Sequence, residues 1–386
     1  MRQKTGCGVA LAAALAFAVL PAMADMPAGT ISTFNQALQN GDAAVIVEAA
    51  KVFGAAAVAH PEDRQAPVAA FEAANQLCLR NACAEAVPMA GFLGGLDDAA
   101  LPVSRAEVEV LAAFAGWSAS AKDKAADSAF RMVLDAHVNV APSLLTIAAF
   151  EAFCAQQPDE PDWEEVARRA TLASSHLQQV RDILPARWAT AELLSITAAF
   201  NADPKFETYD RVSDLNAWVL GKRRDKAYSE NLRSLDYQTM AWSSAMSAFF
   251  RSWNDGRSKY RKKFKDAEAR AEAIKAGFES KGWSDEPGTG RLPFCSGEVL
   301  APPKPSYPKD AARKGYVGAV IIGISFKDGR ISGTNVLAAV PDQAFERVSI
   351  DSVEHFRWVF DETPRDPECT ATKENAIIIP LEYVMQ

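Results

Sequence analysis

The feature that most restricts the fold of this chain is a change in hydrophobic period near residue 318. Between residues 30 and 283 apolar side chains recur every three to four positions, the spacing of one face of an α-helix. From Ala319 to Phe326 the period becomes two, which places Val320, Ile322 and Ile324 on one side of an extended strand. Because neither pattern suits the other structure, the sequence predicts a long helical region followed by a small module with a sheet.

The helical region has the pattern of helix pairs joined by short turns. Gly41 ends a helix that begins at Thr33, Asp42 is placed to cap the next helix, and Pro61 stops it. The pairs recur at roughly 35–40 residues, which resembles tetratricopeptide-like helical hairpins. We expect a helical-hairpin array over residues 25–283, with an irregular helical bundle as the alternative. Four tryptophans fit the core of these helices better than a ligand site: Trp117, Trp188, Trp218 and Trp242.

The N-terminus has the pattern of a cleaved secretory signal. Arg2 and Lys4 precede the apolar run from Val9 to Leu20. A small-residue triplet that ends at Ala24 follows the run. The run is shorter than the roughly 20 apolar residues of a membrane span, so we expect cleavage after Ala24; an uncleaved anchor with a single span is the alternative. Cleavage takes the formal charge from −8 to −10, which does not favour nucleic acid as a partner.

Five cysteines follow the predicted signal. Export permits disulfides, and the most economical pairing joins Cys78 to Cys83 and Cys295 to Cys369, although the sequence leaves other pairings open. Cys154 is then left alone in an apolar helix. Paired cysteine spacing with nearby histidines, the pattern of a zinc site, is missing, so no metal is expected.

Two further segments precede the terminal module. Six cations and no acid occupy nine residues of the last helix, and Glu268 and Glu272 follow. This run could face an anionic surface such as outer-membrane lipid or a cell-wall polymer, but we favour a solvated helix balanced by those two acids. Over residues 284–302 proline and glycine are frequent and the periodicity is lost, which predicts a linker. The six cations are Arg257, Lys259, Arg261, Lys262, Lys263 and Lys265.

The module after the linker, residues 303–386, begins with a short helix and a hairpin. Pro308 suits the first turn of the helix. The strand that ends at Phe326 is followed by Asp328-Gly329, a pair that favours the positive φ angles of a hairpin turn. The second strand runs from Ile331 to Ala338.

A helix and one more strand complete the module. The helix over residues 342–360 carries apolar side chains that can cover the sheet, and the strand spans residues 375–384. Pro380 predicts an edge position for this strand, because proline cannot donate a ladder hydrogen bond. The sequence therefore predicts a small α+β domain with a three-stranded antiparallel sheet.

The order and spacing of these residues resemble the C-terminal domain of TonB-family proteins. The residues that carry the resemblance are Tyr307, Pro308, Gly315, Gly318, Asp328, Gly329 and Trp358. The resemblance implies a periplasmic domain of Gram-negative bacteria that binds by β-augmentation, in which an extended segment of the partner pairs with the last strand. It also implies the contact residues, which are Ala376, Ile377, Ile378, Ile379, Leu381, Tyr383 and Val384.

Three departures argue against an energy-transducing member of that family. A retained membrane anchor and a long proline-rich spacer are lacking, and Lys304-Pro305-Ser306 stands where Gln-Pro is usual. We expect a periplasmic scaffold protein that binds a partner by strand addition. The alternative is a TonB-type energy-transducing component of outer-membrane transport held by an uncleaved anchor.

The expected partners are periplasmic or outer-membrane proteins, and a TonB-dependent receptor is one candidate. Homodimerisation through the C-terminal domain is a further expectation to consider. We expect no catalysis and no cofactor, because G-x-S-x-G and H-E-x-x-H are missing and the glycines near Gly288 follow no strand. The acidic pair Asp97-Asp98 fits a helix cap better than a catalytic dyad.

Overall fold

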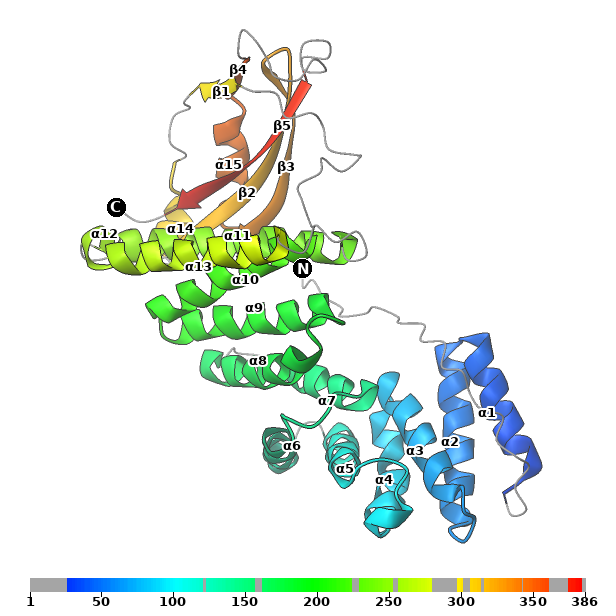
Figure 1. Ribbon diagram of the computed structural model, residues 1–386. Helices are drawn as coiled ribbons and strands as arrows, with labels where there is room; N and C mark the ends of the chain where they lie inside the picture. The colour runs from blue at the N-terminus through cyan, green and yellow to red at the C-terminus, as the bar shows by residue number, and fades with distance from the viewer. Residues whose placement is uncertain are drawn as a thin grey trace. The chain divides into compact units, whose positions relative to one another are not determined.

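The computed structural model of this chain describes residues 26–120, 123–156, 162–223, 229–252, 256–279, 297–300, 306–313, 316–341, 343–360 and 374–383 (Figure 1). The predicted signal, residues 1–24, lies outside these ranges. Contacts within the chain divide it into two compact units, one up to Val133 and one from Leu134 onward. Helices dominate, and an antiparallel sheet of five strands follows them. The predicted order of a long helical region and a small α+β module is confirmed.

The first unit is helical, and its helix ends follow the predicted signals. Gly41 ends α1 with a φ of 72°, and Asp42 caps α2 by accepting hydrogen bonds from the backbone N–H groups of Ala44 and Val45. The first helix begins earlier than the expected Thr33. The elements are α1 (Ala28–Asn40), α2 (Ala43–Ala59), α3 (Ala66–Leu79), η1 (Cys83–Ala86), α4 (Val87–Gly94), η2 (Asp98–Ala100), α5 (Arg105–Ala119) and α6 (Lys124–Ala136), whose last turn passes the unit boundary.

Small and aromatic side chains fill the core between these helices. Ala50, Ala70 and Ala74 are fully buried, which lets α2 and α3 approach closely. Phe34 of α1 stacks on Phe53 of α2 with ring centroids 4.6 Å apart. Antiparallel neighbours therefore pack pairwise along this unit, while the finer likeness to tetratricopeptide hairpins stays a prediction.

The second unit begins with another series of helices. Ser143 caps the first of them in a capping box with Thr146, and Asp162 caps the next. His176 joins the two, because its ring stacks on Phe150 at 4.2 Å. The elements are α7 (Leu144–Ala155), α8 (Trp163–Leu177), η3 (Gln178–Val180), α9 (Pro185–Ala202), α10 (Phe206–Arg223), α11 (Ser229–Ser252), α12 (Gly256–Lys259) and α13 (Arg261–Glu279).

The sheet has the strand order β1-β4-β3-β2-β5, and every neighbouring pair is antiparallel. Asp328 and Gly329 have φ angles of 50° and 71°, which confirms the predicted hairpin turn between β2 and β3. The elements are β1 (Gly297–Leu300), α14 (Lys309–Arg313), β2 (Gly318–Lys327), β3 (Arg330–Val340), α15 (Glu346–Val353), β4 (Arg357–Phe360) and β5 (Glu374–Tyr383).

The prediction of three strands was wrong, because two short strands were missed. β1 lies inside the predicted linker, and β4 lies inside the predicted helix over residues 342–360, which ends at Val353. The segment after that helix is rich in aromatic and β-branched residues that favour extended structure. Its Trp358 donates a backbone hydrogen bond of 2.9 Å to the carbonyl of Gly329, which ties β4 to the hairpin. Residues 284–296 and 301–302 of the predicted linker lie outside the described residues.

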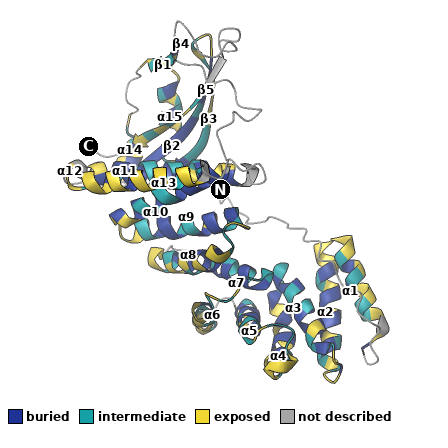
Figure 2. Ribbon diagram, viewed as in Figure 1, coloured by how far each residue is buried: buried dark blue, intermediate teal, exposed yellow. Residues whose placement is uncertain are grey.

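Both faces of β2 are buried, because a different helix covers each face (Figures 1 and 2). Val320, Ile322, Ile324 and Phe326 point into a core that includes Phe345 and residues of α15. The alternate residues point to α11, which packs across β2, β3 and β5. The side chains of this second core are Tyr237, Met240, Ala241, Trp242 and Ala245 of α11 with Ala319, Ile321, Leu337, Ala338 and Val340 of the sheet.

Candidate partner-binding edge of the C-terminal sheet

Strand β5 forms one end of the sheet, as Pro380 predicted. It pairs with β2 over ten residues without a register shift, from Gly318 opposite Tyr383 to Lys327 opposite Glu374. Its other side has no strand neighbour among the described residues. The predicted contact residues from Ala376 to Tyr383 therefore lie on an edge strand of the described sheet, while Val384 is outside the described residues.

The side chains of β5 alternate between the two faces of the sheet. Ile377, Ile379 and Leu381 pack against the core under α15, and Tyr383 is buried in it. Ile378 lies on the opposite face and is 44% exposed. An apolar side chain thus stays accessible on this strand, although the strand itself is well anchored.

The position of Pro380 indicates which backbone groups of β5 face outward. Pro380 lies opposite Ile321 in an unbroken register. A proline fits there only if its nitrogen points away from β2, because it cannot donate to the ladder. In an antiparallel strand alternate residues share the same direction, so the backbone groups of Ala376, Ile378 and Glu382 also face the open side.

The other long edge of the sheet, along β3, has different properties. β4 pairs with β3 only at Arg330 opposite Arg357. The β2–β3 register shifts twice, between Ile321 and Ile322 and between Ser325 and Phe326. The exposed residues of β3 are polar or small: Arg330, Ser332, Gly333, Thr334 and Asn335. Bulges and polar residues protect sheet edges from pairing, so within the described sheet β5 is the edge better suited to accept a strand.

The C-terminal end of β5 is fixed by one buried hydrogen bond and one electrostatic contact. The hydroxyls of Tyr383 and Ser349 are 2.6 Å apart, and burial raises the pKa of Tyr383, with the Ser349 bond opposing this. Burial also raises the pKa of Glu382, while the positive charge of Arg251 on α11 lowers it. Arg251 thus lies within electrostatic reach of the edge strand.

Residues that carry the resemblance to TonB-family domains, although far apart in sequence, meet around this core. The Tyr307 ring packs edge-on to Phe345 with centroids 5.5 Å apart, and its hydroxyl donates to the carbonyl of Tyr316. A Cβ atom on Gly318 would overlap the Val340 carbonyl and the Phe345 ring, so glycine is required there.

The remaining motif residues lie beside that core or outside the described chain. A Cβ on Gly329 would lie 2.6 Å from the Trp358 carbonyl, next to the turn residue Asp328. The carbonyl of Pro308 accepts a hydrogen bond of 2.9 Å from Ala312 at the start of α14. Gly315 lies outside the described residues.

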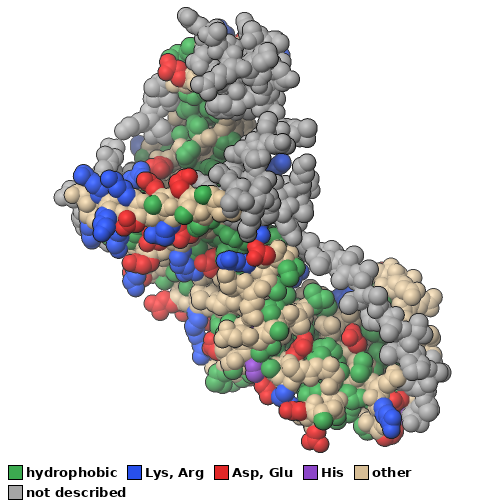
Figure 3. Space-filling model, viewed as in Figure 1, with side chains coloured by type: hydrophobic (Ala, Val, Ile, Leu, Met, Phe, Trp, Pro, Cys, Tyr) green, Lys and Arg blue, Asp and Glu red, His purple; other side chains and the backbone are tan. Residues whose placement is uncertain are grey.

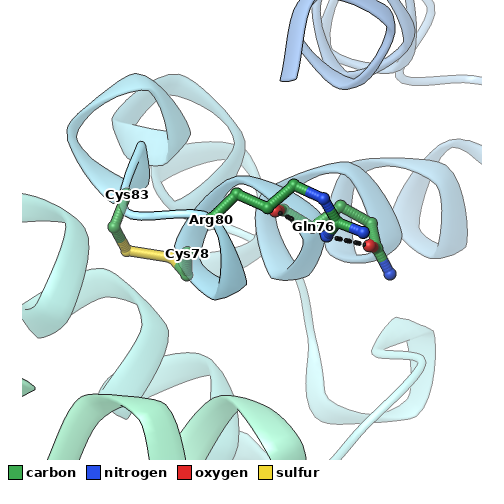
Figure 4. Close-up of a disulfide and its surroundings, with 4 residues drawn as sticks. All are labelled: Gln76, Cys78, Arg80 and Cys83. Atoms are coloured by element: carbon green, nitrogen blue, oxygen red, sulfur yellow. Dashed lines mark hydrogen bonds between the residues drawn. A yellow bond between two sulfur atoms is a disulfide. The ribbon is translucent and has the colours of Figure 1, made fainter. Parts of the chain in front are cut away.

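The predicted Cys78–Cys83 disulfide is formed and joins the end of α3 to η1 (Figure 4). Beside it, the Arg80 guanidinium donates to the backbone carbonyl and the side-chain oxygen of Gln76. Cys295 and Cys369 lie outside the described residues, so their pairing stays a prediction. Cys154 lies half-buried in α7.

Other sequence candidates have structural positions. Trp117, Trp188 and Trp218 are buried, and the half-buried Trp242 packs between α11 and the sheet, as expected of core residues. Asp97 makes no side-chain cap on η2, and Asp98 instead pairs with Arg105 at 2.7 Å. Within the described ranges no three His, Cys, Asp or Glu side chains gather as a metal site would require.

Sequence reasoning missed the packing of α11 on the sheet. Ala241 and Ala245 are small residues four positions apart on one helix face, which permits close approach to another element. The alternate residues of β2, Ala319 and Ile321, are also apolar, so the strand has no polar face at this end. Together these were the available signals of a second buried face.

Comparisons with protein-family models, with curated proteins and with solved structures each found no match to this chain. The likeness to TonB-family domains therefore rests on the residues named above. Every helix in the described part of the chain is too short or too polar to span a membrane.

Proposed function

We propose that this chain is a non-catalytic periplasmic scaffold protein whose C-terminal sheet binds an extended segment of a partner protein along β5. The contrast between the two sheet edges carries the proposal. The β3 edge is bulged and polar, whereas β5 keeps a continuous register and exposes Ile378. A long, regular and partly apolar edge is a liability in a secreted protein unless a partner uses it.

The outward backbone groups of β5 define what the partner must offer. Ala376, Ile378 and Glu382 present N–H and C=O groups, whereas Pro380 presents only a carbonyl. A partner strand that pairs with all four residues can form up to seven hydrogen bonds, each contributing about 0.5–1.5 kcal/mol. Sequence selectivity would come from the partner side chains next to Ile378, because backbone pairing is the same for any sequence.

The helical region would contact a second protein in this scaffold. That part of the proposal rests on the likeness to helical-hairpin arrays, whose stacked repeats form extended binding surfaces. The periplasmic location rests on the signal-like N-terminus. Intact mass and N-terminal sequencing test it: a periplasmic chain that begins at Asp25 supports the scaffold, and a membrane-bound chain that begins at Met1 favours the energy-transducing alternative.

Site-specific photocrosslinking in producing cells tests strand addition. A photoreactive amino acid replaces Ile378 on the proposed edge, and the control replaces the exposed Thr334 on the β3 edge. We expect a discrete protein adduct from position 378 and none from position 334. Ala376→Pro, which removes one of the outward N–H groups without affecting the β2 ladder, should reduce the adduct several-fold. Equal adducts from both positions, or an adduct that Ala376→Pro leaves unchanged, would contradict the proposal.

A further inference from the structure

The N-terminal end of α13 carries a concentration of positive charge that strand addition does not use. Residues 257–265 contain six cations and no acid, while the rest of the chain has 35 Lys and Arg against 49 Asp and Glu, a net −14. Five of these cations have described, exposed side chains: Lys259, Arg261, Lys262, Lys263 and Lys265. Figure 3 shows Lys and Arg side chains gathered at this end of the helix, beside α12.

The first turn of α13 is an unfavourable place for these cations. The N-terminus of a helix carries partial positive charge, so nearby cations destabilise the helix. The first turn of α13 contains no acid to offset it. A sequence that places cations against the helix dipole breaks a local rule of helix stability, and such departures are expected where a surface serves another purpose.

Most of these cations form no ion pair with an acid of the described residues. Lys263 pairs with Glu207 of α10 at 3.4 Å. No acidic side chain of the described chain pairs with Lys259, Arg261, Lys262 or Lys265. Three acids of α10 also pair with this helix. They are Glu207, which pairs with Lys263, and Asp210 and Asp214, which pair with Arg270.

Aromatic rings beneath the patch hold its base in place. Tyr260 stacks on the buried Phe206 with centroids 4.9 Å apart. The Lys259 Nζ lies 5.0 Å from the Tyr260 ring centroid, and the Lys263 Nζ lies 5.3 Å from that of Phe206. The inner side of α13 is occupied by buried Phe264, so the helix cannot turn its other face outward. The patch is therefore a fixed outer surface of the second unit.

From this arrangement we infer that the basic surface at the junction of α12 and α13, defined by Lys259 of α12 and Arg261, Lys262 and Lys265 of α13, is a docking surface for an anionic lipid bilayer. Four of the six cations of the run are lysines, whose compact hydrated charges suit a diffuse anionic surface better than bidentate recognition of one carboxylate. Within α13, Arg261, Lys262 and Lys265 lie within about 100° of one another around the helix axis. They therefore form one face of the helix, which can lie flat against a plane of charge.

Each cation near an anionic membrane surface strengthens binding by roughly fivefold, so four contribute several hundredfold. The attraction acts over about a Debye length, so salt weakens it. The docking is peripheral, because the apolar side of α13 stays packed against α10 and α11.

Vesicle cosedimentation of the full chain tests this inference. The vesicles are phosphatidylcholine alone or phosphatidylcholine with a third phosphatidylglycerol, at low and high salt. The test variant carries Lys259→Gln, Arg261→Gln, Lys262→Gln and Lys265→Gln, which leaves the Lys263–Glu207 pair intact. The control variant makes the same charge change at exposed positions elsewhere: Lys124→Gln, Lys309→Gln, Arg313→Gln and Arg347→Gln.

We expect the unchanged chain and the control variant to bind anionic vesicles in a salt-sensitive manner, and the test variant to bind at least a hundredfold more weakly. Any binding through the apolar run near the N-terminus would be the same for both vesicle types and in all three proteins. It therefore cannot produce a difference between the test variant and the control variant. Circular dichroism confirms that the variants fold. Failure of the unchanged chain to prefer anionic vesicles, or equal binding by the two variants, overturns the inference, and neither result bears on strand addition at β5.

Discussion

Two neighbouring isoleucines in β2 test whether α11 and the sheet share one core. Ile321 and Ile322 are both fully buried and lie next to each other, but Ile321 packs under α11 and Ile322 packs in the core with α15. Truncating a fully buried isoleucine to alanine costs about 2–5 kcal/mol. If α11 covers the sheet, Ile321→Ala and Ile322→Ala should therefore cost similar free energies of unfolding.

Hydrogen exchange followed by mass spectrometry is the suitable assay, because a chain with two compact units need not unfold in one step. With Ile321→Ala we expect the amides of both β2 and α11 around Ala241 and Ala245 to lose protection. With Ile322→Ala we expect the loss in β2 and α15, and a smaller change in α11.

Packing of α11 on the sheet is refuted if Ile321→Ala lowers the free energy of unfolding by less than about 1 kcal/mol while Ile322→Ala lowers it by the amount expected of a core residue. A cost below that limit is what a surface substitution would give. The packing is also refuted if α11 keeps its protection in the Ile321→Ala variant. Either result would mean that the sheet and the helices are separate bodies joined by a linker, as the sequence alone had predicted.

Three further predictions concern single positions. Burial lowers the pKa of His176 in the folded chain below the roughly 6.5 of the unfolded chain. At pH values between these two pKa values, the unfolded state therefore binds more protons than the folded state. Stability should therefore fall as pH drops from 7.5 to 5.5, and the urea midpoint of His176→Gln should depend less on pH. Cys78→Ser removes the disulfide to Cys83, which closes a short loop and contributes about 2 kcal/mol. The substitution should therefore lower the urea midpoint, and adding a reductant to this variant should cause no further change in the first unit. Pro380→Ala adds one outward N–H to β5 and should increase self-association in sedimentation measurements relative to the unchanged chain, whereas no increase would contradict a strand-accepting edge at this residue.

The sequence predicted local features well because short-range chemistry decides them. The Asp42 cap, the Asp328-Gly329 turn and the edge position of β5 each follow from what one side chain or one missing N–H allows. The Cys78–Cys83 bond follows from the small number of partners within reach.

The missed features depend on contacts between distant segments. β1 and β4 have only four residues each, and β1 forms only because the backbone of β4 is available to pair with it. The cover provided by α11 depends on two alanines meeting a strand about 75 residues later, so the local patterns indicate that each surface is buried but not that the two surfaces are partners. Two of the acids that pair with the basic helix, Glu207 and Asp214, come from α10, more than 50 residues away.

The double burial of β2 also restricts insertions and deletions along the chain. Odd-numbered residues such as Ala319 and Ile321 serve one core, and even-numbered residues such as Val320 and Ile322 serve the other. Adding or removing one residue just before this stretch would exchange the two sets, because side chains alternate along a strand. The exposed residues 332–335 of β3 carry no such constraint. Length variation should therefore be tolerated at that end of the sheet and selected against near Gly318.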